Sequence, residues 1–188
     1  MKVYFDATPS KLDEYRENYQ TIGRIITELG HQLTSRWILD FDESFFRMPR
    51  KGWINHYRTI VSALERADVA VLDISVSSTS VGQLIQQALV WKKPVIALRD
   101  HKQAANIFLE GAGEAESKII IVEYTLDDIK ARLVEAFDYV EEWLESRFTL
   151  ILPTHVRRHL DQIAKSGTTR SEYIRKLIEK DMKKGEGK

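Results

Sequence analysis

The chain has 188 residues, of which 43% are hydrophobic, enough for one α/β core with a small appendage. It contains no cysteine, which excludes disulfides and thiolate metal sites, and we expect a reducing, cytoplasmic location. The formal net charge is zero, no apolar run approaches the roughly 18 residues of a membrane span, and no signal-peptide pattern follows Met1, so no membrane partner is expected.

The first half of the chain alternates apolar strands with amphipathic helices. A strand at 3–5 precedes a helix over 12–29 that Gly30 ends, and a loop or lid over 40–51 precedes a helix over 53–66. Residues 69–74 form a nearly continuous apolar run, which is typical of a strand buried on both faces of a parallel sheet.

The same alternation continues to about residue 145. A small-residue loop over 75–80 leads to a helix over 81–91, strands follow at 94–98 and 118–122, and a closing helix spans 126–144. Because strands alternate with helices, the sequence predicts an α/β fold for residues 1–145, a flavodoxin-like parallel sheet flanked by helices.

Candidate ligand residues follow from this topology, because ligands of such sheets bind beyond the carboxyl ends of the strands. Asp6 and Asp73 lie at two of those ends, and the loop after the second carries Ser78 and Gly82. The loops contain neither GxGxxG nor GxxxxGK[ST], so no dinucleotide cofactor is expected. The five histidines do not have a metal-ligand spacing, and no metal site is predicted.

The last forty or so residues have a different pattern. Phe148, Leu150 and Leu152 alternate with outward positions in a short strand that Pro153 ends. Two helices follow, one opening at Thr154 and ending at Gly167, and one opening at Thr169, which is spaced from Glu172 as in a capping box. A strand and two helices of this length cannot close a core alone, so two copies are expected to pair their strands.

Charge separates this tail from the rest of the chain. Residues 147–188 hold 11 Lys and Arg against five Asp and Glu, a net charge of +6, whereas residues 1–146 hold 17 against 23, a net charge of −6. A basic appendage on an acidic body indicates a polyanion as partner of the tail.

The tail resembles the Arc/MetJ/CopG ribbon-helix-helix family in its segments Leu152-Pro153, Leu160-Asp161 and Arg170-Ser171-Glu172-Tyr173-Ile174-Arg175. The resemblance covers residues 146–184 and implies a homodimer that binds DNA. A homotetramer would follow if the rest of the chain also dimerises, through a different surface, and residues 185–188 are expected to be a disordered tail. The resemblance implies major-groove contacts from the outward side chains of the strand and phosphate contacts from backbone N–H groups at the start of the second helix. In this sequence these are Arg147, Thr149 and Ile151, and Thr169, Arg170 and Ser171.

The body resembles the nucleoside 2-deoxyribosyltransferase superfamily, including the 2′-deoxynucleoside 5′-phosphate N-hydrolases, over roughly residues 1–140. The matching segments are Ala67–Ile74, Ser78–Gly82 and Leu109–Ala112. The resemblance implies a homodimer with a pocket for a nucleoside or its monophosphate, and it puts Leu84 where the family has its nucleophilic Glu. A leucine cannot attack an anomeric carbon, so no catalytic residue is predicted.

We therefore expect a DNA-binding regulator with an inactive, nucleotide-binding body. Asp6, Asp73, Ser78 and Gly82 are the candidate ligand residues, although Ser78 would have the same place if it only capped the helix. The alternative is a glycosidic hydrolase that recruits Asp6 or Asp73 and uses the tail only to oligomerise. A purely structural interaction partner is a third hypothesis.

Overall fold

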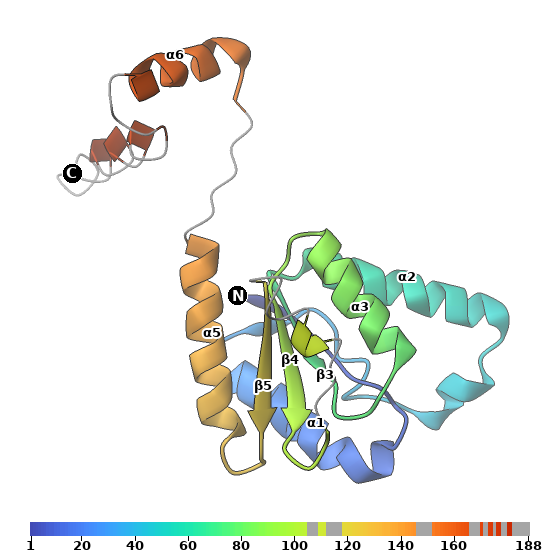
Figure 1. The fold of residues 1–188 in the computed structure, drawn as a ribbon. Coiled ribbons are helices and arrows are strands. Elements are labelled where there is room, and N and C mark those ends of the chain that lie inside the picture. The colour runs from blue at the N-terminus through green and yellow to red at the C-terminus, as the bar shows by residue number, and fades with distance from the viewer. Residues whose placement is uncertain are drawn as a thin grey trace. The chain divides into compact units, whose positions relative to one another are not determined.

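The computed structural model describes residues 1–104, 109–111, 118–145 and 152–165, together with residues 170, 173, 174, 176, 177, 180 and 181. The chain divides into two compact units, Met1–Ser146 and Arg147–Lys188 (Figure 1). Below, the first unit is called the body and the second the tail unit. Among the described residues, no helix is long and apolar enough to cross a membrane.

A parallel sheet of five strands forms the centre of the body, with the order β2-β1-β3-β4-β5. The strands are β1 (Lys2–Asp6), β2 (Gln32–Leu33), β3 (Val69–Asp73), β4 (Val95–Asp100) and β5 (Ile119–Tyr124). Every strand pair is parallel, which confirms the predicted α/β class. The order is the flavodoxin-like one, in which a ligand binds at the carboxyl edge near the point where the winding reverses.

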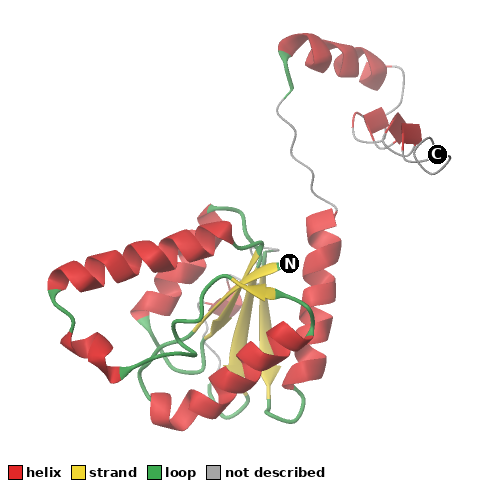
Figure 2. Cartoon of the chain, turned by 180° about the vertical axis from the view of Figure 1, so that it is seen from behind, coloured by secondary structure: helices red, strands yellow, loops and turns green. Residues whose placement is uncertain are grey.

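Helices cover both faces of this sheet, as parallel strands require (Figure 2). The helices with described bounds in the body are α1 (Leu12–Glu28), α2 (Arg50–Arg66), α3 (Thr79–Val90) and α5 (Ile129–Glu145), with a short 3-10 helix, η1 (Glu43–Arg47), before α2. Helices α1 and α5 pack with each other and with one apolar layer, and α2 and α3 with the other.

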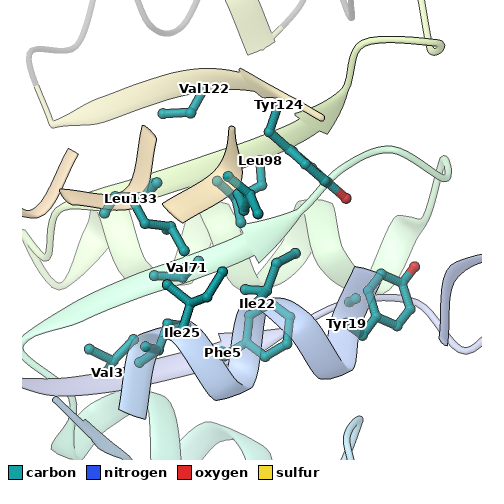
Figure 3. Packing of buried hydrophobic residues seen from close by; sticks show 14 of the residues in the cluster. Val3, Phe5, Tyr19, Ile22, Ile25, Val71, Leu98, Val122, Tyr124 and Leu133 are labelled. Atoms are coloured by element: carbon teal, nitrogen blue, oxygen red, sulfur yellow. The ribbon is translucent and has the colours of Figure 1, made fainter. Parts of the chain in front are cut away.

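The two layers are built from alternate residues of the same strands. Val3 and Phe5 of β1 and Val71 of β3 point into the layer beneath α1 and α5 (Figure 3). Tyr4 and Leu72, from the same two strands, point into the layer beneath α2 and α3. Burial on both faces explains why these strands read as continuous apolar runs.

The structure differs from the sequence prediction at several ends. Strand β2 was not expected, and η1 lies within the segment predicted to be a loop or lid. Strands β4 and β5 each extend two residues beyond the predicted ends, to Asp100 and Tyr124. Gly30, predicted to end α1, has a φ of 84°, a left-handed conformation that glycine adopts without strain.

In the tail unit, α6 (Thr154–Lys165) begins directly after Pro153, as predicted. Leu160 of this helix is buried, and Arg170 forms an ion pair with Asp161 at 2.6 Å. The predicted strand, except Leu152, and the candidate DNA contacts Arg147, Thr149, Ile151, Thr169 and Ser171 lie outside the described residues.

Candidate functional site

The carboxyl edge of the sheet brings together acidic and tyrosine side chains. Asp6, Asp73 and Asp100 are the last residues of β1, β3 and β4, and Tyr124 is the last of β5. All four are buried, although three of them are acids. Because the strands are parallel neighbours, the residues lie along one edge, where a ligand of this fold class would bind.

The strand register puts Asp6 and Asp73 on opposite faces of the sheet. Asp6 shares its face of β1 with Tyr4, two residues earlier, on the side of α2 and α3. Asp73 shares its face of β3 with Val71, on the side of α1 and α5. The edge therefore carries two separate polar clusters, and the two carboxyls do not face each other as a catalytic pair would.

The Asp6 cluster consists of Tyr4, Asp6 and Trp37. Oδ1 of Asp6 accepts hydrogen bonds from the backbone N–H of Ala7 at 2.8 Å and from Nε1 of Trp37 at 2.6 Å, while the Tyr4 hydroxyl donates to Oδ2. Burial raises the pKa of Asp6 from 3.8 to about 7, although these hydrogen bonds favour the charged form. Burial and the nearby Asp6 charge also raise the pKa of the Tyr4 phenol.

The Asp73 cluster consists of Asn18, Asp73, Ser75 and Tyr124. Asp73 accepts from the Tyr124 hydroxyl at 2.7 Å and from the backbone N–H of Ser75 at 2.9 Å. Asn18 donates to the same hydroxyl at 3.2 Å. Burial raises the pKa of Asp73 to about 6, and the neighbouring Asp100 raises it further, against the lowering effect of the hydrogen bonds.

Further polar contacts link the Asp73 cluster to the loop after β4. The backbone N–H of Asp100 donates to the Ser75 hydroxyl at 2.8 Å, and Gln103 donates to the Tyr15 hydroxyl, also at 2.8 Å. Tyr15 stacks on Tyr19 with ring centroids 6.0 Å apart. Figure 3 shows Tyr19 and Tyr124 at the same end of the core cluster. This edge is thus closed by side chains that bind one another.

Chemically, each carboxyl can hold or release a proton near neutral pH, as active-site acids do. Both nevertheless have protein donors on both oxygens and are buried. A ligand would have to replace some of these donors to reach them. Within the part of the chain that the structure describes, no group of three or more histidine, aspartate or glutamate side chains could hold a metal ion.

Ser78 and Gly82 lie at the start of α3. The Ser78 hydroxyl accepts from the backbone N–H of Val81 at 3.4 Å and so caps the helix. Gly82 is exposed, and a Cβ placed on it would meet nothing within 4 Å. The helix start is therefore open to a ligand, but the contact that Ser78 makes is the one expected of a cap.

Leu84, where the family resemblance expects a nucleophilic Glu, is only 9% exposed. It belongs to the apolar layer between α3 and the sheet, together with Val81, Ile85 and Ile60. A leucine in this environment supplies neither a nucleophile nor a negative charge to stabilise an oxocarbenium ion.

The sequence did not indicate Tyr4, Asn18, Trp37 and Tyr124 as site residues. Tyr4, Trp37 and Tyr124 donate hydrogen bonds to the two carboxyls, and Asn18 donates to the Tyr124 hydroxyl. Only the position of Tyr124 could have been predicted. The sequence prediction ends β4 at Leu98 and β5 at Val122 because a charged residue follows each of them. In the structure those residues, Arg99 and Glu123, are paired across the two strands at 2.7 Å. Strands extended through this pair end at Asp100 and Tyr124.

Two solved structures show a fold similar to the body, whereas no family model and no curated protein matches the chain. The CMP N-glycosidase BcmB of Clostridium botulinum is similar over 72% of this chain and 99% of its own, with a TM-score of 0.52 and 15% identity. A 2-deoxyribosyltransferase of Bacillus psychrosaccharolyticus is similar over 69% of this chain and 90% of its own, with a TM-score of 0.50 and 13% identity. The body thus has an α/β fold similar to the folds of these two proteins.

Proposed function

We propose that the chain is a DNA-binding regulator in which the tail unit is a ribbon-helix-helix dimer and the body is an inactive deoxyribosyltransferase-like module that binds a nucleoside or nucleotide. The observation that carries this proposal is the charge difference between the two compact units. The tail unit, Arg147–Lys188, has a net charge of +6, and Met1–Ser146 has −6. A polyanion would be attracted to the tail unit and repelled by most of the body.

The described part of the tail unit supports pairing with a second copy. Leu160 of α6 is buried, but Val156 and Ile163 on the same stripe are only partly so. A helix with such a stripe needs further apolar surface, which the helices of a second chain would supply. Arg170 is predicted to contact phosphate through its backbone N–H, a group that its side-chain ion pair with Asp161 does not use.

The body supports ligand binding better than catalysis. Leu84 is buried at the nucleophile position, and Asp6 and Asp73 lie on opposite faces of the sheet. The open start of α3 at Gly82 offers a place for a phosphate, the group that distinguishes nucleotides from nucleosides. Since the two structural relatives are named for acting on CMP and on nucleosides, we propose ligands of that chemical kind.

A gel-shift experiment tests DNA binding. The full chain is titrated onto duplex DNA from its own promoter region and onto unrelated duplex, and the double variant Arg147→Ala/Arg170→Ala is compared with it. Each substitution lowers the charge of the tail unit by one, and Arg147→Ala also removes a predicted major-groove contact, so binding should weaken by at least about tenfold. The control, Arg16→Ala/Lys102→Ala, removes two exposed cations from the body and should bind like the wild type.

The second candidate is a glycosidic hydrolase, and the pKa values near 7 for Asp6 and near 6 for Asp73 favour it. Because the two carboxyls lie on opposite faces, one of them would have to act alone. Incubation with CMP and deoxynucleosides, with free base as the readout, separates the candidates. Release of base that disappears in Asp6→Asn or Asp73→Asn would establish the hydrolase, and no release is expected from a regulator.

A further inference from the structure

The N-terminal half of α2 and the preceding η1 form a basic island on an acidic body. Between Glu43 and Glu65 the sequence has no acidic residue and four basic ones: Arg47, Arg50, Lys51 and Arg58. This segment therefore carries +4 within a body of −6. In both Figure 1 and Figure 2, the start of α2 and η1 extend beyond the sheet.

Large apolar side chains are exposed on the same segment. Phe46 is 57% exposed, Trp53 45%, Ile54 43% and Tyr57 61%. Together with Arg50, Lys51 and Arg58 these residues are called the α2 surface below. Phe46 belongs to η1 and the other three to α2, and exposed large apolar residues that cluster mark an interaction site more often than single exposed residues do.

The α2 surface rests on a rigid aromatic base. Phe45 lies beneath it, with its ring centroid 5.2 Å from Trp53, 4.8 Å from His56 and 5.3 Å from Trp37. Nε1 of Trp53 also donates to the backbone oxygen of Met48 at 2.8 Å. Trp53 is therefore held in place while almost half of its surface stays open, as in a preformed stacking platform.

Three cations of the α2 surface are available to a ligand. In the residues that the structure describes, Arg50, Lys51 and Arg58 are exposed and form no ion pair. Arg47 is different, because its charge helps to lower the pKa of Asp42. Exposed cations that form no ion pair on a body of opposite net charge favour an anionic partner.

The order of residues along α2 decides which anionic partner fits. Residues three, four and seven apart share a helix face, so Arg50 lies on one face with Trp53, Ile54 and Tyr57. Arg58 follows Ile54 by four residues and lies beside the same stripe. The cations are therefore interleaved with the aromatic rings rather than segregated on the opposite face.

We propose that the α2 surface binds single-stranded nucleic acid, with bases stacked on Trp53 and Tyr57 and phosphates held by Arg50, Lys51 and Arg58. Aromatic rings alternating with cations are the arrangement that such strands recognise, because every base has a face that stacks and every linkage carries a charge. This goes beyond the proposed function, since the binding element lies in the body and not in the tail unit.

Two other occupants fit the surface less well. An amphipathic helix that lies in a membrane interface keeps its cations off the inserted apolar face, whereas Arg50 lies within that face here. A second copy packed on α2 around a two-fold axis would bring three cations from each chain into one interface, because the same patch is used on both chains and the α2 surface has no acidic residue to pair with them. Of these three occupants, the strand of nucleic acid matches both the rings and the charges.

The test uses the full chain and a fluorescein-labelled single strand of mixed sequence, about 12 nucleotides long, with binding followed by anisotropy. Tyr57→Ala should weaken binding about tenfold, the loss expected for one stacked base. Arg50→Gln/Arg58→Gln should lower the slope of log affinity against log salt by about 1.4, since each phosphate that a cation neutralises on a single strand contributes about 0.7. Strand binding should also quench Trp53 emission, a signal that Trp53→Phe removes.

Matched controls come from the body itself. Tyr139→Ala removes a tyrosine of α5 that is 51% exposed, and Arg16→Gln removes an exposed arginine of α1. Neither should change binding of the strand. In the tail variant Arg147→Ala/Arg170→Ala, the weakening caused by Tyr57→Ala and by Arg50→Gln/Arg58→Gln should be unchanged. The α2 surface is thereby tested independently of duplex binding by the tail unit.

Several results would overturn the proposal. Tyr57→Ala and Tyr139→Ala could weaken binding of the strand equally, or Arg50→Gln/Arg58→Gln could leave the salt slope unchanged. Binding to vesicles with 30% anionic lipid, abolished in Tyr57→Ala and without binding of the strand, would identify the surface as a membrane contact. A dimer in sedimentation that dissociates in Tyr57→Ala, again without strand binding, would identify it as a contact between copies.

Discussion

Replacing Asp6 by asparagine should remove part of the pH dependence of the free energy of unfolding. Asparagine has the shape of the protonated carboxyl: its oxygen still accepts from Ala7 and Trp37, and its amide donates toward the Tyr4 hydroxyl. The variant therefore keeps the hydrogen bonds from Ala7 and Trp37, reverses the direction of the one with Tyr4, and removes the ionisation.

The sign follows from the raised pKa. The pKa of Asp6 is about 7 in the folded chain against 3.8 ordinarily, so between these values the folded state holds a proton that the unfolded state has released. The free energy of unfolding contributed by this group therefore falls as pH rises from about 4 to about 7. A shift of roughly three pKa units at 1.36 kcal/mol each corresponds to about 4 kcal/mol across that window.

Urea unfolding at intervals from pH 4 to pH 8 measures this contribution as the difference between Asp6→Asn and the wild type. Between pH 4 and pH 8, the free energy of unfolding of the variant should rise by about 4 kcal/mol relative to that of the wild type, because only the wild type ionises in this range. Asp73→Asn is the matched comparison: its gain should be complete at about pH 6, since the pKa of Asp73 is about 6. If the difference in free energy of unfolding between Asp6→Asn and the wild type does not change with pH, or falls as pH rises, burial does not raise the pKa of Asp6.

Three further substitutions test the body. Tyr124→Phe removes the hydroxyl that donates to Asp73 at 2.7 Å, and should lower the free energy of unfolding by about 1–3 kcal/mol in urea titrations at pH 8; an unchanged value would contradict the Asp73 cluster. Leu84→Glu buries a carboxyl in an apolar layer and should lower the free energy of unfolding by about 3 kcal/mol at pH 7 and by less at pH 5. It should not release base from CMP, and a released base would show a pocket competent for catalysis. Lys92→Gly relieves a φ of 59° after α3 and should raise the melting temperature by the equivalent of about 1 kcal/mol, whereas a lower melting temperature would speak against strain there.

The sequence predicts the sheet because burial leaves a local trace. The strands β3 and β4 are apolar on both faces, so their runs are visible without knowledge of their neighbours. Strand β2 leaves no such trace: it has two residues, Gln32 and Leu33, and exists only because β1 offers its edge. Likewise, the aromatic packing around Phe45 joins residues from 37 to 56, and no local pattern reports such contacts.

The sequence predicts where the acidic residues of the candidate site lie in the sheet, but not which face each one is on or which side chains bind it. Strand ends place Asp6 and Asp73 at the carboxyl edge, and both are there. Their opposite faces follow from register between strands, and their donors Trp37 and Tyr124 lie 31 and 51 residues away in the sequence. Such contacts depend on the tertiary fold, so the sequence could not indicate that both carboxyls are buried and hydrogen-bonded; their role as ligand residues stays a prediction.

The salt dependence of duplex binding by the full chain tests the central claim most directly. Affinity for a 20-base-pair duplex is measured by anisotropy over a series of salt concentrations, for the wild type and for Arg147→Ala/Arg170→Ala. A regulator that binds through its tail unit should lose affinity linearly on a double-logarithmic plot, and the slope should fall by about 0.9 for each phosphate that the variant no longer neutralises. Affinity that does not depend on salt, or that is the same in the variant, would contradict the assignment of DNA binding to the tail unit.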